Sequence, residues 1–559
     1  MKKLAGAALL ITALTVLSRI AGFGRTVVFL RSVGDGPLGN IYNAANTIPN
    51  IVFELVAGGA LASLVVPLLA GDVAAARPDR AGRVASALLT WVLVAMVPLA
   101  ILVALLAGPI SGLLPDVPPE HRAVAASMLR VFAPQLPLYG AGIVLTGVLQ
   151  AHHRFAWPVI APLLSSVTVM AAYLTYAGVD GSRTDFGGLT RTGELVLSIG
   201  TTLGVVVLAL CLLIPLRRLR LRWRPSLRFP GDEGRRAVRL GWAGAVTVGS
   251  QQVMVGVVIL LAVSDGLTAY SAAQTVFLLP WAVLAVPLAT AVYPTLSAAD
   301  PDGFDRALAP VARSVVLLAG LGAAALFALA EPVAYLVGTR SAAPGIRGFA
   351  AGLFGYALFA LLSRALYARG ATRAAAASTA AGWGVAAVAA VLLTWGLGEE
   401  RQVYALGLAN AIGMSVIGLL LVYAVRRHAG AAALSGLGRA AAAGIVAAVV
   451  AALAGWSLTR AIASGMGPGF GGSVVQGLAG GLAVLAAYLA VVLLLDRRDL
   501  RGLRGLRGRR TREADGGSDG TTLAVEKDAA AESDVAVGKD AAAESDVAVG
   551  KDAAGKGET

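Results

Sequence analysis

Long apolar stretches alternate with short polar connections along almost the whole chain. A helix needs roughly 20 mostly apolar residues to cross a membrane, and each of these stretches is long enough. We predict spans at 4–32, 39–71, 84–114, 122–150, 157–179, 190–216, 237–264, 267–297, 308–337, 345–369, 373–397, 402–426, 436–462 and 470–495. The pattern therefore predicts an all-α integral membrane protein with about fourteen transmembrane helices.

The last part of the chain breaks this pattern. After a run of arginines, the segment KDAAAESDVAVG starts at Lys527, repeats at Lys539 and begins again at Lys551. It is rich in Ala, Asp and Lys and has no aromatic residue. Such a segment buries too little apolar surface to offset the entropy of ordering. We therefore predict a disordered tail over 496–559.

The charges of the connections predict how the chain is oriented. Every second connection, like both termini, carries the basic clusters, with these residues: Lys2, Lys3, Arg77, Arg80, Arg83, Arg154, Arg217, Arg218, Arg369, Arg373, Arg426, Arg427, Arg497 and Arg498. Arginine and lysine concentrate in cytoplasmic loops, so both termini are predicted to be cytoplasmic, in a multi-pass protein of the cytoplasmic (inner) membrane. Two opposite connections depart from this bias with two arginines each: Arg183 with Arg191, and Arg340 with Arg347.

Composition narrows the class of protein further. Hydrophobic residues make up 57% of the chain and charged residues 14%, against about 45–50% and about 25% in soluble domains. The net charge of +14 is explained by the basic connections, so we expect no nucleic-acid partner. The single cysteine, Cys211, excludes an intramolecular disulfide and a cysteine-based metal site. The chain carries no Walker A, HExxH or GxSxG motif, so we expect neither an enzyme nor a cofactor.

A similarity between two proline-containing spans predicts two related lobes. The second span contains Pro49 and Pro67, and the eighth contains Pro280 and Pro294, with a basic connection between them. Duplicated halves are typical of transporters, whose substrate site lies between the halves. The predicted organisation is an N-terminal lobe at 1–216, a basic loop at 217–236, a C-terminal lobe at 237–426, two extra helices at 427–495 and the tail at 496–559.

Two arginines and a polar stripe fall within predicted spans. Arg19 and Arg25 lie in the first span, and guanidinium groups pair well with phosphate. Asn43, Asn46, Asn50 and Glu54 follow helical 3-4-4 spacing and so share one face of the second span. A weaker polar set comprises Ser250, Gln251 and Gln274. Polar groups at membrane depth must face protein or a water-filled cavity.

These residues remain open to a structural interpretation. The arginines could reach the membrane interface or pair with a carboxylate such as Glu54, and the asparagines could bond neighbouring helices. The functional interpretation places all nine in a substrate-binding cavity.

Several segments resemble one known family. The stretches SRIAGFGR (18–25), IPN (48–50), AGGA (57–60), VVPLL (65–69), SQQ (250–252) and VYPTLS (292–297) are similar to the MurJ/MviN lipid II flippases of the multidrug/oligosaccharidyl-lipid/polysaccharide exporter superfamily. The resemblance implies a V-shaped transporter with a cationic central cavity. It implies alternating access that moves an undecaprenyl-pyrophosphate-linked peptidoglycan precursor to the outer leaflet, helped by membrane potential or a coupling cation. It also implies a groove for the lipid tail at the last two helices.

The chain departs from that family at several polar positions. The family's arginine after the Pro-Asn of the second helix corresponds to Phe53 or Glu54 here, and its arginine in the eighth helix corresponds to Thr275. Of the family's cavity arginines, only Arg19 and Arg25 carry over. A divergent paralogue with another lipid-linked substrate therefore stays open.

Three other functions remain as alternatives. A cation-coupled drug exporter would need a carboxylate at mid-span, for which Glu54 is the candidate. A non-transporting scaffold would use the basic loops and the tail to recruit partners such as cell-wall synthesis proteins. A polytopic glycosyltransferase would need an acidic catalytic pair in an outer connection, and the sequence offers none that is convincing.

Overall fold

The structure is a computed structural model that describes residues 2–55, 59–75, 77–182, 184–219, 224–227, 233–466 and 469–495. The chain divides into two units, 1–497 and 498–559, and every described element belongs to the first unit. The tail predicted to be disordered lies outside the described residues. All regular elements of the described ranges are helices.

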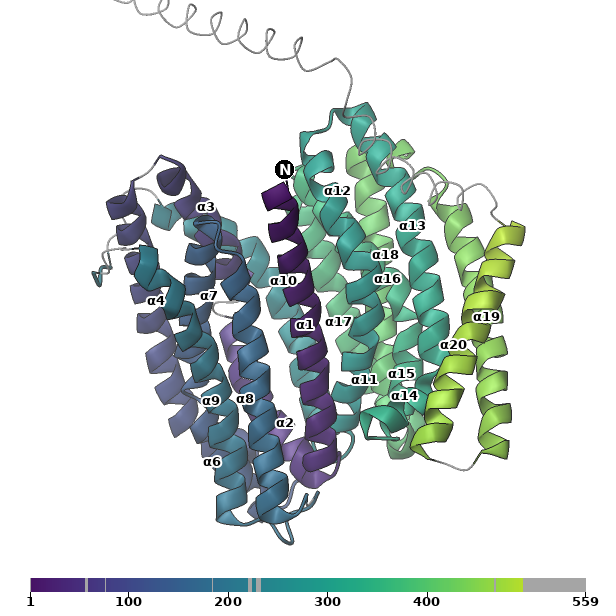
Figure 1. The fold of residues 1–559 in the computed structure, drawn as a ribbon, viewed down its shortest axis with the longest axis horizontal. Helices are drawn as coiled ribbons and strands as arrows, with labels where there is room; N and C mark the ends of the chain where they lie inside the picture. Colours follow the sequence, from purple (N-terminus) through teal and green to yellow (C-terminus); the bar gives the residue numbers. More distant parts are fainter. Residues whose placement is uncertain are drawn as a thin grey trace, which may run out of the picture. The chain divides into compact units, whose positions relative to one another are not determined.

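Figure 1 shows the helices in chain order, with the sequence running from purple to yellow. Their bounds are α1 Lys2–Ser32, α2 Pro37–Phe53, α3 Gly59–Ala74, α4 Pro78–Leu105, α5 Ala107–Gly112, α6 Pro119–Phe132, α7 Gln135–Ala151, α8 Ala156–Asp180, α9 Arg191–Leu216, η2 Arg217–Leu219, α10 Glu233–Ala262, α11 Leu267–Pro280, η3 Trp281–Ala285, α12 Val286–Ala298, α13 Pro301–Ala328, α14 Ala330–Val337, α15 Ala342–Ala350, α16 Gly352–Ala368, α17 Thr372–Leu397, η4 Glu399–Arg401, α18 Gln402–Ala429, η5 Ala432–Leu434, α19 Leu437–Gly465 and α20 Phe470–Leu495.

The fourteen predicted spans coincide with these helices or with broken pairs of them. In the described part of the chain, ten helical segments are long and apolar enough to cross a membrane, and α15 with α16, bent by 57°, makes an eleventh. The other three predicted spans fall on α1, on α2 with α3, and on α10. The prediction of an all-α membrane protein is therefore confirmed, and the chain is a multi-pass membrane protein.

Equivalent helices of the two halves pack in the same pairs. In the first half α1 packs on α8, and α8 on α9; in the second half α10 packs on α17, and α17 on α18. In the first half, the α6–α7 span packs against α2–α3. In the second half, the α15–α16 span packs against α11–α12 in the same way. The same packing scheme therefore occurs twice, as the paired prolines predicted. The last two helices, α19 and α20, pack on each other and on α13.

Both the second and the eighth span contain π-helical residues, which are Glu54 and Leu55 in the second span. Helix α2 ends at Phe53, four residues after Pro49, and α3 begins at Gly59. In the eighth span α11 ends at Pro280 and a π-helical turn precedes α12. Proline removes a backbone donor from the helical ladder, and π-turns inside helices are frequent at functional sites. Both spans lie where the two halves meet, because α2 packs against α11 and α3 packs against α10.

Close helix packing in the second half depends on glycine. A Cβ on Gly355 of α16 would lie 2.1 Å from the carbonyl oxygen of Met414 in α18. A Cβ on Gly418 would lie 2.7 Å from the Cα of Gly355. Backbones that approach this closely gain dispersion contacts that lipid cannot supply.

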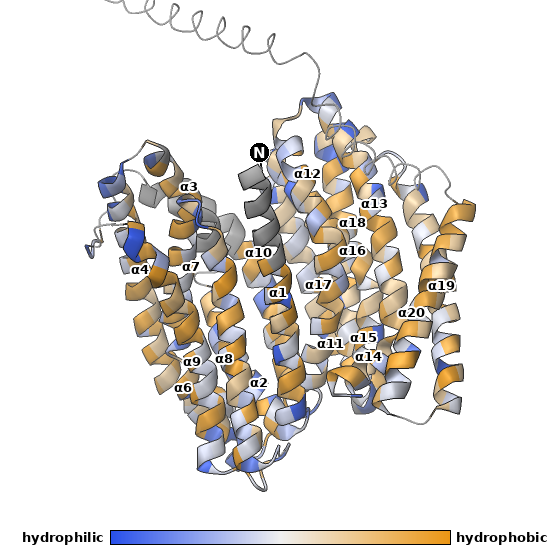
Figure 2. Ribbon diagram, viewed as in Figure 1, coloured by the Kyte–Doolittle hydropathy of each residue, from blue (hydrophilic) through white to orange (hydrophobic). Residues whose placement is uncertain are grey.

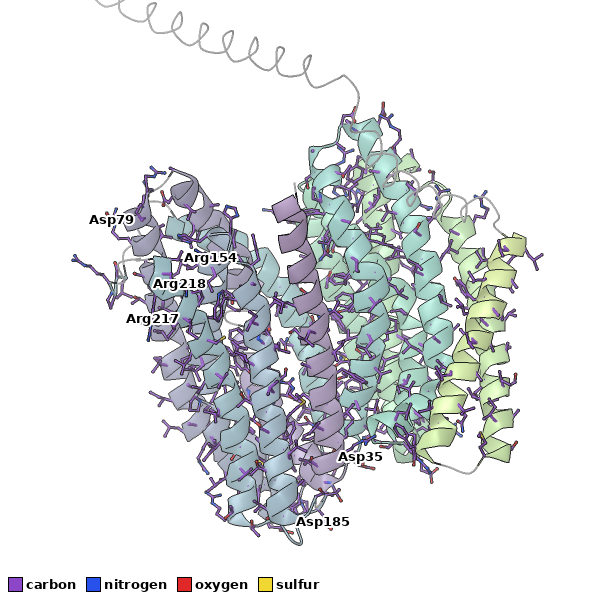
Figure 3. The ribbon with its side chains drawn as sticks, viewed as in Figure 1. Asp35, Asp79, Arg154, Asp185, Arg217 and Arg218 are labelled. Atoms are coloured by element: carbon purple, nitrogen blue, oxygen red, sulfur yellow. The ribbon has the colours of Figure 1, made fainter. Side chains whose placement is uncertain are left out.

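Hydrophobic residues predominate along the middle of the helices and hydrophilic residues gather toward their ends, as Figure 2 shows. Large side chains such as Trp395, Leu419 and Leu494 are 86%, 70% and 72% exposed, which is favourable in lipid and costly in water. Figure 3 places Arg154, Arg217 and Arg218 at one end of the bundle and Asp35 and Asp185 at the other. We name these the Arg217 end and the Asp35 end.

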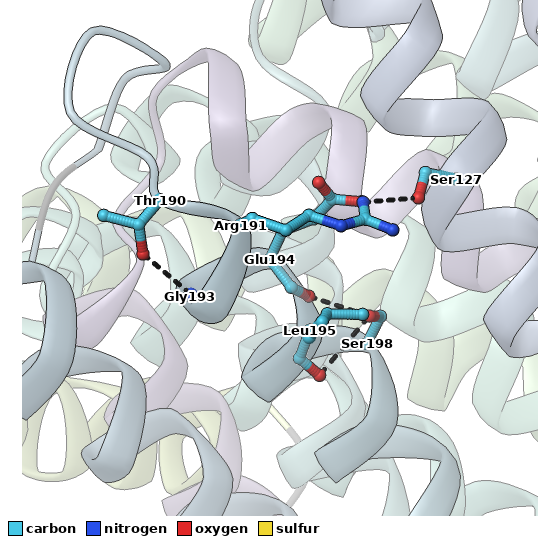
Figure 4. Close-up of polar contacts among 7 residues, drawn as sticks. All are labelled: Ser127, Thr190, Arg191, Gly193, Glu194, Leu195 and Ser198. Atoms are coloured by element: carbon cyan, nitrogen blue, oxygen red, sulfur yellow. Dashed lines mark hydrogen bonds and ion pairs between the residues drawn. The ribbon is translucent and has the colours of Figure 1, made fainter.

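The connection between α8 and α9 shows how the Asp35 end is fixed (Figure 4). Thr190 caps α9, because its hydroxyl oxygen accepts a hydrogen bond from the Gly193 N–H at 3.0 Å. Arg191 pairs with the buried carboxylate of Glu194 at 2.7 Å and donates to Ser127 of α6 at 3.0 Å. These contacts tie α6 to the start of α9.

Candidate functional site

A polar cavity of about 220 Å³ lies between the two halves. Helices α1, α2, α7, α8 and α9 form one wall and α11 forms the other. Its polar lining residues are Arg25, Thr26, Tyr42, Asn43, Asn46, Asn50, Tyr139, Ser165, Tyr173, Thr201, Thr268, Ser271 and Thr275. We call this cavity the central pocket.

Arg25 supplies the positive charge of the central pocket. It is the one ionisable acid or base other than tyrosine among the described lining residues. Its side chain is exposed, and no carboxylate of the described chain pairs with it. A guanidinium carries five donors in a planar fork, which suits the oxygens of a phosphate group. The pocket therefore offers a cation without an internal counter-ion.

A cluster of buried hydroxyl groups forms the wall beside Arg25. The Tyr42 hydroxyl lies 2.5 Å from Thr201 Oγ1 and 2.9 Å from the Tyr173 hydroxyl. The Tyr42 and Tyr173 rings meet edge to face, with centroids 6.0 Å apart. The Thr201 hydroxyl also lies 2.8 Å from the Leu197 carbonyl of its own helix. This network ties α2 to α8 and α9 and so gives the pocket a rigid wall.

The asparagines of α2 differ in their hydrogen-bond partners: some bond to the second half, and one bonds within α2. The Asn43 side chain donates to the Thr268 hydroxyl at 2.9 Å, and the Asn40 side chain accepts from the Thr268 N–H at 2.9 Å. Both bonds cross from α2 to α11. Asn50 donates to the Asn46 carbonyl one turn earlier, at 3.0 Å. Asn46 Oδ1 is buried without a hydrogen-bond partner in the described structure, so this acceptor is available to a ligand.

A second set of contacts joins the halves at the Asp35 end. Asp35 accepts hydrogen bonds from the hydroxyls of Thr339 and Ser341. Arg31 donates to the Leu336 carbonyl at 3.1 Å. These five residues connect the end of α1 and the α1–α2 turn to α14 and the α14–α15 turn, and we call them the latch. Toward the Arg217 end, α3 packs along α10, so the central pocket lies between two regions of contact.

Four of the nine predicted site residues meet in the central pocket. They are Arg25, Asn43, Asn46 and Asn50. The three asparagines that share one helix face by their spacing thus line one pocket, and their role in binding a substrate stays a prediction.

The other five predicted residues do not line the central pocket. Arg19 is exposed on α1, and Glu54 is half-buried at the end of α2. Ser250 donates to the Thr247 carbonyl of its own helix at 2.8 Å. Gln251 and Gln274 are half-buried and lie outside the pocket, although Thr275, next to Gln274, lines it.

Sequence reasoning missed the hydroxyl cluster. Tyr42 precedes Asn46 by four residues, so helical spacing could have placed it on the polar face. Tyr173, Thr201 and Thr268 come from three other helices. No pattern along the chain indicates that they meet Tyr42 or Asn43.

An apolar groove of about 570 Å³ lies on the second half, between α13, α16, α18 and α19. Phe327, Phe354, Leu358 and Leu419 are among its lining residues, and Arg426 is its one charged lining residue in the described chain. One of the two extra helices, α19, lines it. Such a surface suits an acyl or prenyl chain.

A family model described as "Lipid II flippase MurJ" matches residues 30–476. A probable lipid II flippase MurJ of Rhizobium meliloti is 27% identical over 343 residues, which cover 58% of this chain and 62% of that protein. One from Synechocystis is 29% identical, with 41% and 44% covered. A lipid II flippase MurJ of Burkholderia cenocepacia is 26% identical, with 58% and 64% covered. The chain thus covers less than two thirds of each of these relatives.

Solved structures share the fold. A structure titled lipid II flippase MurJ, inward closed conformation, aligns with a TM-score of 0.68 at 16% identity, covering 88% of this chain and 99% of that one. An inward-facing multidrug resistance MATE family transporter of the MOP superfamily aligns with a TM-score of 0.60 at 15% identity, covering 77% and 99%. At these identities the likeness shows the fold alone.

Proposed function

Because the chain belongs to the MurJ family, a family of lipid II flippases, we propose that it moves lipid II from the inner to the outer leaflet of the inner membrane. The observation that carries the proposal is Arg25, an unpaired cation in a polar pocket between two lobes. Lipid II joins a pyrophosphate, a saccharide-peptide and a prenyl tail. A flippase must hold the charged part away from lipid while it crosses.

The chemistry of the central pocket matches the polar part of such a substrate. Arg25 pairs with the pyrophosphate through charge-assisted hydrogen bonds. The free Oδ1 of Asn46 accepts from a sugar hydroxyl or a peptide N–H. The apolar groove along α19 accommodates part of the prenyl chain. With one arginine in place of several, the pyrophosphate binds more weakly, by about 1.5–3 kcal/mol for each missing charged contact.

The pocket must widen to load this substrate. Its volume of about 220 Å³ is below the roughly 300–1,000 Å³ of sites for drug-sized ligands, and lipid II is larger than these. Opening therefore requires the lobes to separate at one end at a time. With both termini cytoplasmic, loading separates α3 from α10, and release breaks the latch at the Asp35 end. The cycle is an alternating-access mechanism.

Complementation tests the proposal. The chain is expressed in a bacterial host whose resident lipid II flippase is depleted, alongside Arg25→Ala and, as a control on the same helix, Arg19→Ala. We expect rescue by the wild type and by Arg19→Ala, and none by Arg25→Ala at equal membrane levels.

Reconstitution gives an independent measure. Wild-type protein in vesicles with fluorescent lipid II should move the label across the bilayer, with or without an imposed potential or ion gradient. A wild type that is inserted but neither rescues the host nor moves lipid II under any gradient contradicts the proposal. The search would then turn to other polyprenyl-linked saccharides.

A further inference from the structure

A second pocket is lined by arginines at the end of the bundle that is predicted to lie outside, where the chain has few basic residues. Arg340 lies in the α14–α15 connection, which is predicted to lie outside, Arg347 lies in α15, and Arg460 lies near the C-terminal end of α19. Together they line a cavity of about 390 Å³ between α14, α15, α19 and α20, with Glu331, Tyr335, Trp456, Ser473 and Gln476 among its other lining residues. We call it the arginine pocket. It lies at the Asp35 end, because α14 and α15 flank latch residues Thr339 and Ser341.

The arginine pocket has an excess of positive charge. Arg347 pairs with Glu331 at 3.2 Å. Arg340 and Arg460 pair with no carboxylate of the described chain; they stack 4.8 Å above the rings of Tyr335 and Trp456. Stacking orients a guanidinium plane and leaves its N–H edges free to donate. Three arginines against one carboxylate leave two positive charges.

The floor of the arginine pocket is polar, and its side chains have unused hydrogen-bonding capacity. Ser473 and Gln476 of α20 are only 6% and 9% exposed, and the described structure gives neither side chain a hydrogen-bond partner. Arg347 Nε is also buried without a partner. Leaving a buried N–H group such as this one unpaired is unfavourable. A ligand that supplies acceptor oxygens removes this cost.

We propose that the arginine pocket binds a phosphate group, carried by an anionic lipid headgroup of the adjoining leaflet or free in solution. Guanidinium edges, an amide and a hydroxyl converge there, and a phosphate offers several acceptor oxygens and a negative charge. Large apolar side chains near the same ends of α19 and α20, Met466, Phe470 and Leu478, are exposed, so acyl chains can pack beside a bound headgroup. The inference does not rest on lipid II transport.

The test uses the full chain in detergent micelles and native mass spectrometry. The probes are short-chain phosphatidylglycerol, phosphatidylcholine with the same acyl chains, and inorganic phosphate. The pocket variant is Arg340→Gln with Arg460→Gln. The matched control, Arg217→Gln with Arg218→Gln, removes the same charge from exposed positions at the other end. We expect the pocket variant to bind its phosphate ligand at least about tenfold more weakly than the wild type and the control.

The two sources are separated by the probes. Tighter binding of phosphatidylglycerol than of phosphatidylcholine or free phosphate identifies a lipid headgroup; binding of free phosphate alone identifies a soluble ligand. Equal binding of both phosphate probes by the wild type and the pocket variant overturns the proposal. Gln476→Leu is the second variant, because it removes an unpaired amide and should not lower the melting temperature. Unchanged binding by Gln476→Leu also overturns the proposal.

Discussion

The two lobes share a packing scheme but present different chemistry to the central pocket. The N-terminal lobe contributes Arg25, the hydroxyl of Tyr42 and the free acceptor of Asn46. The C-terminal lobe contributes small hydroxyl residues, Thr268 and Thr275 among them, and no charge in its described part. Helix packing restricts residues where backbones meet, as at Gly355, whereas side chains facing a cavity can diverge without loss of packing. Under the proposed function, this difference would place the charged part of lipid II against the N-terminal lobe.

The largest expected effect removes the charge from the N-terminal wall. Arg25→Ala should weaken lipid II binding at least about tenfold, because a charge-assisted contact contributes about 1.5–3 kcal/mol. Thr275→Ala, on the facing wall, should weaken it less, by about twofold to tenfold, since a neutral hydroxyl contributes about 0.5–1.5 kcal/mol. Titration of purified protein with lipid II measures both. Equal losses of lipid II affinity in the two variants would mean that both walls contribute equally to binding.

A smaller effect should follow from breaking the latch that joins the lobes. Asp35→Ala removes the acceptor for Thr339 and Ser341, so the open state at the Asp35 end gains population. The readout is a Ser271→Cys reporter in the central pocket, against the buried native Cys211. Its labelling by a membrane-impermeant thiol reagent should accelerate several-fold.

The latch prediction has a matched control at the same end. Asp185 is exposed, and Asp185→Ala should leave the labelling rate of the Ser271→Cys reporter unchanged. If both aspartate variants accelerate labelling alike, the effect is one of surface charge and the latch does not hold the lobes together.

A positive charge added to the uncharged wall, formed by the C-terminal lobe, tests whether both walls contact the same part of the substrate. Thr275→Arg places a second guanidinium in the central pocket, at the position where the family has arginine by resemblance. Repulsion from Arg25 offsets part of the benefit, so lipid II affinity should rise only about threefold. Thr275→Gln, of similar length without the charge, should not raise it. A fall in affinity with Thr275→Arg would show that the two walls do not both contact the pyrophosphate.

The smallest effect is expected from a carboxylate of the N-terminal lobe that lies outside the pocket. Glu54 ends α2 and does not line the central pocket. Glu54→Gln should therefore leave complementation and lipid II movement within about twofold of wild type. Loss of transport in this variant, with a changed dependence on pH or sodium, would instead favour cation-coupled export.

Sequence reasoning reached the elements more securely than the site. The apolar stretches located the helices because the length of a span is set by the thickness of the bilayer. The asparagine spacing found three pocket residues because neighbours on one helix face are fixed by its period. Arg19 and Arg25 looked equivalent along the chain, yet only Arg25 lines the pocket. Which face of α1 meets a cavity depends on where α8 and the other helices pack.

By itself, the sequence determined the all-helical membrane class and the positions of the spans, since these follow from local hydropathy. The tertiary structure alone decided which polar groups meet. Tyr42 joins Tyr173 and Thr201 from two other helices, and Arg460 joins Arg340 from a distant part of the chain. Contacts of that kind are set by how whole helices pack, and no local pattern in the sequence encodes them.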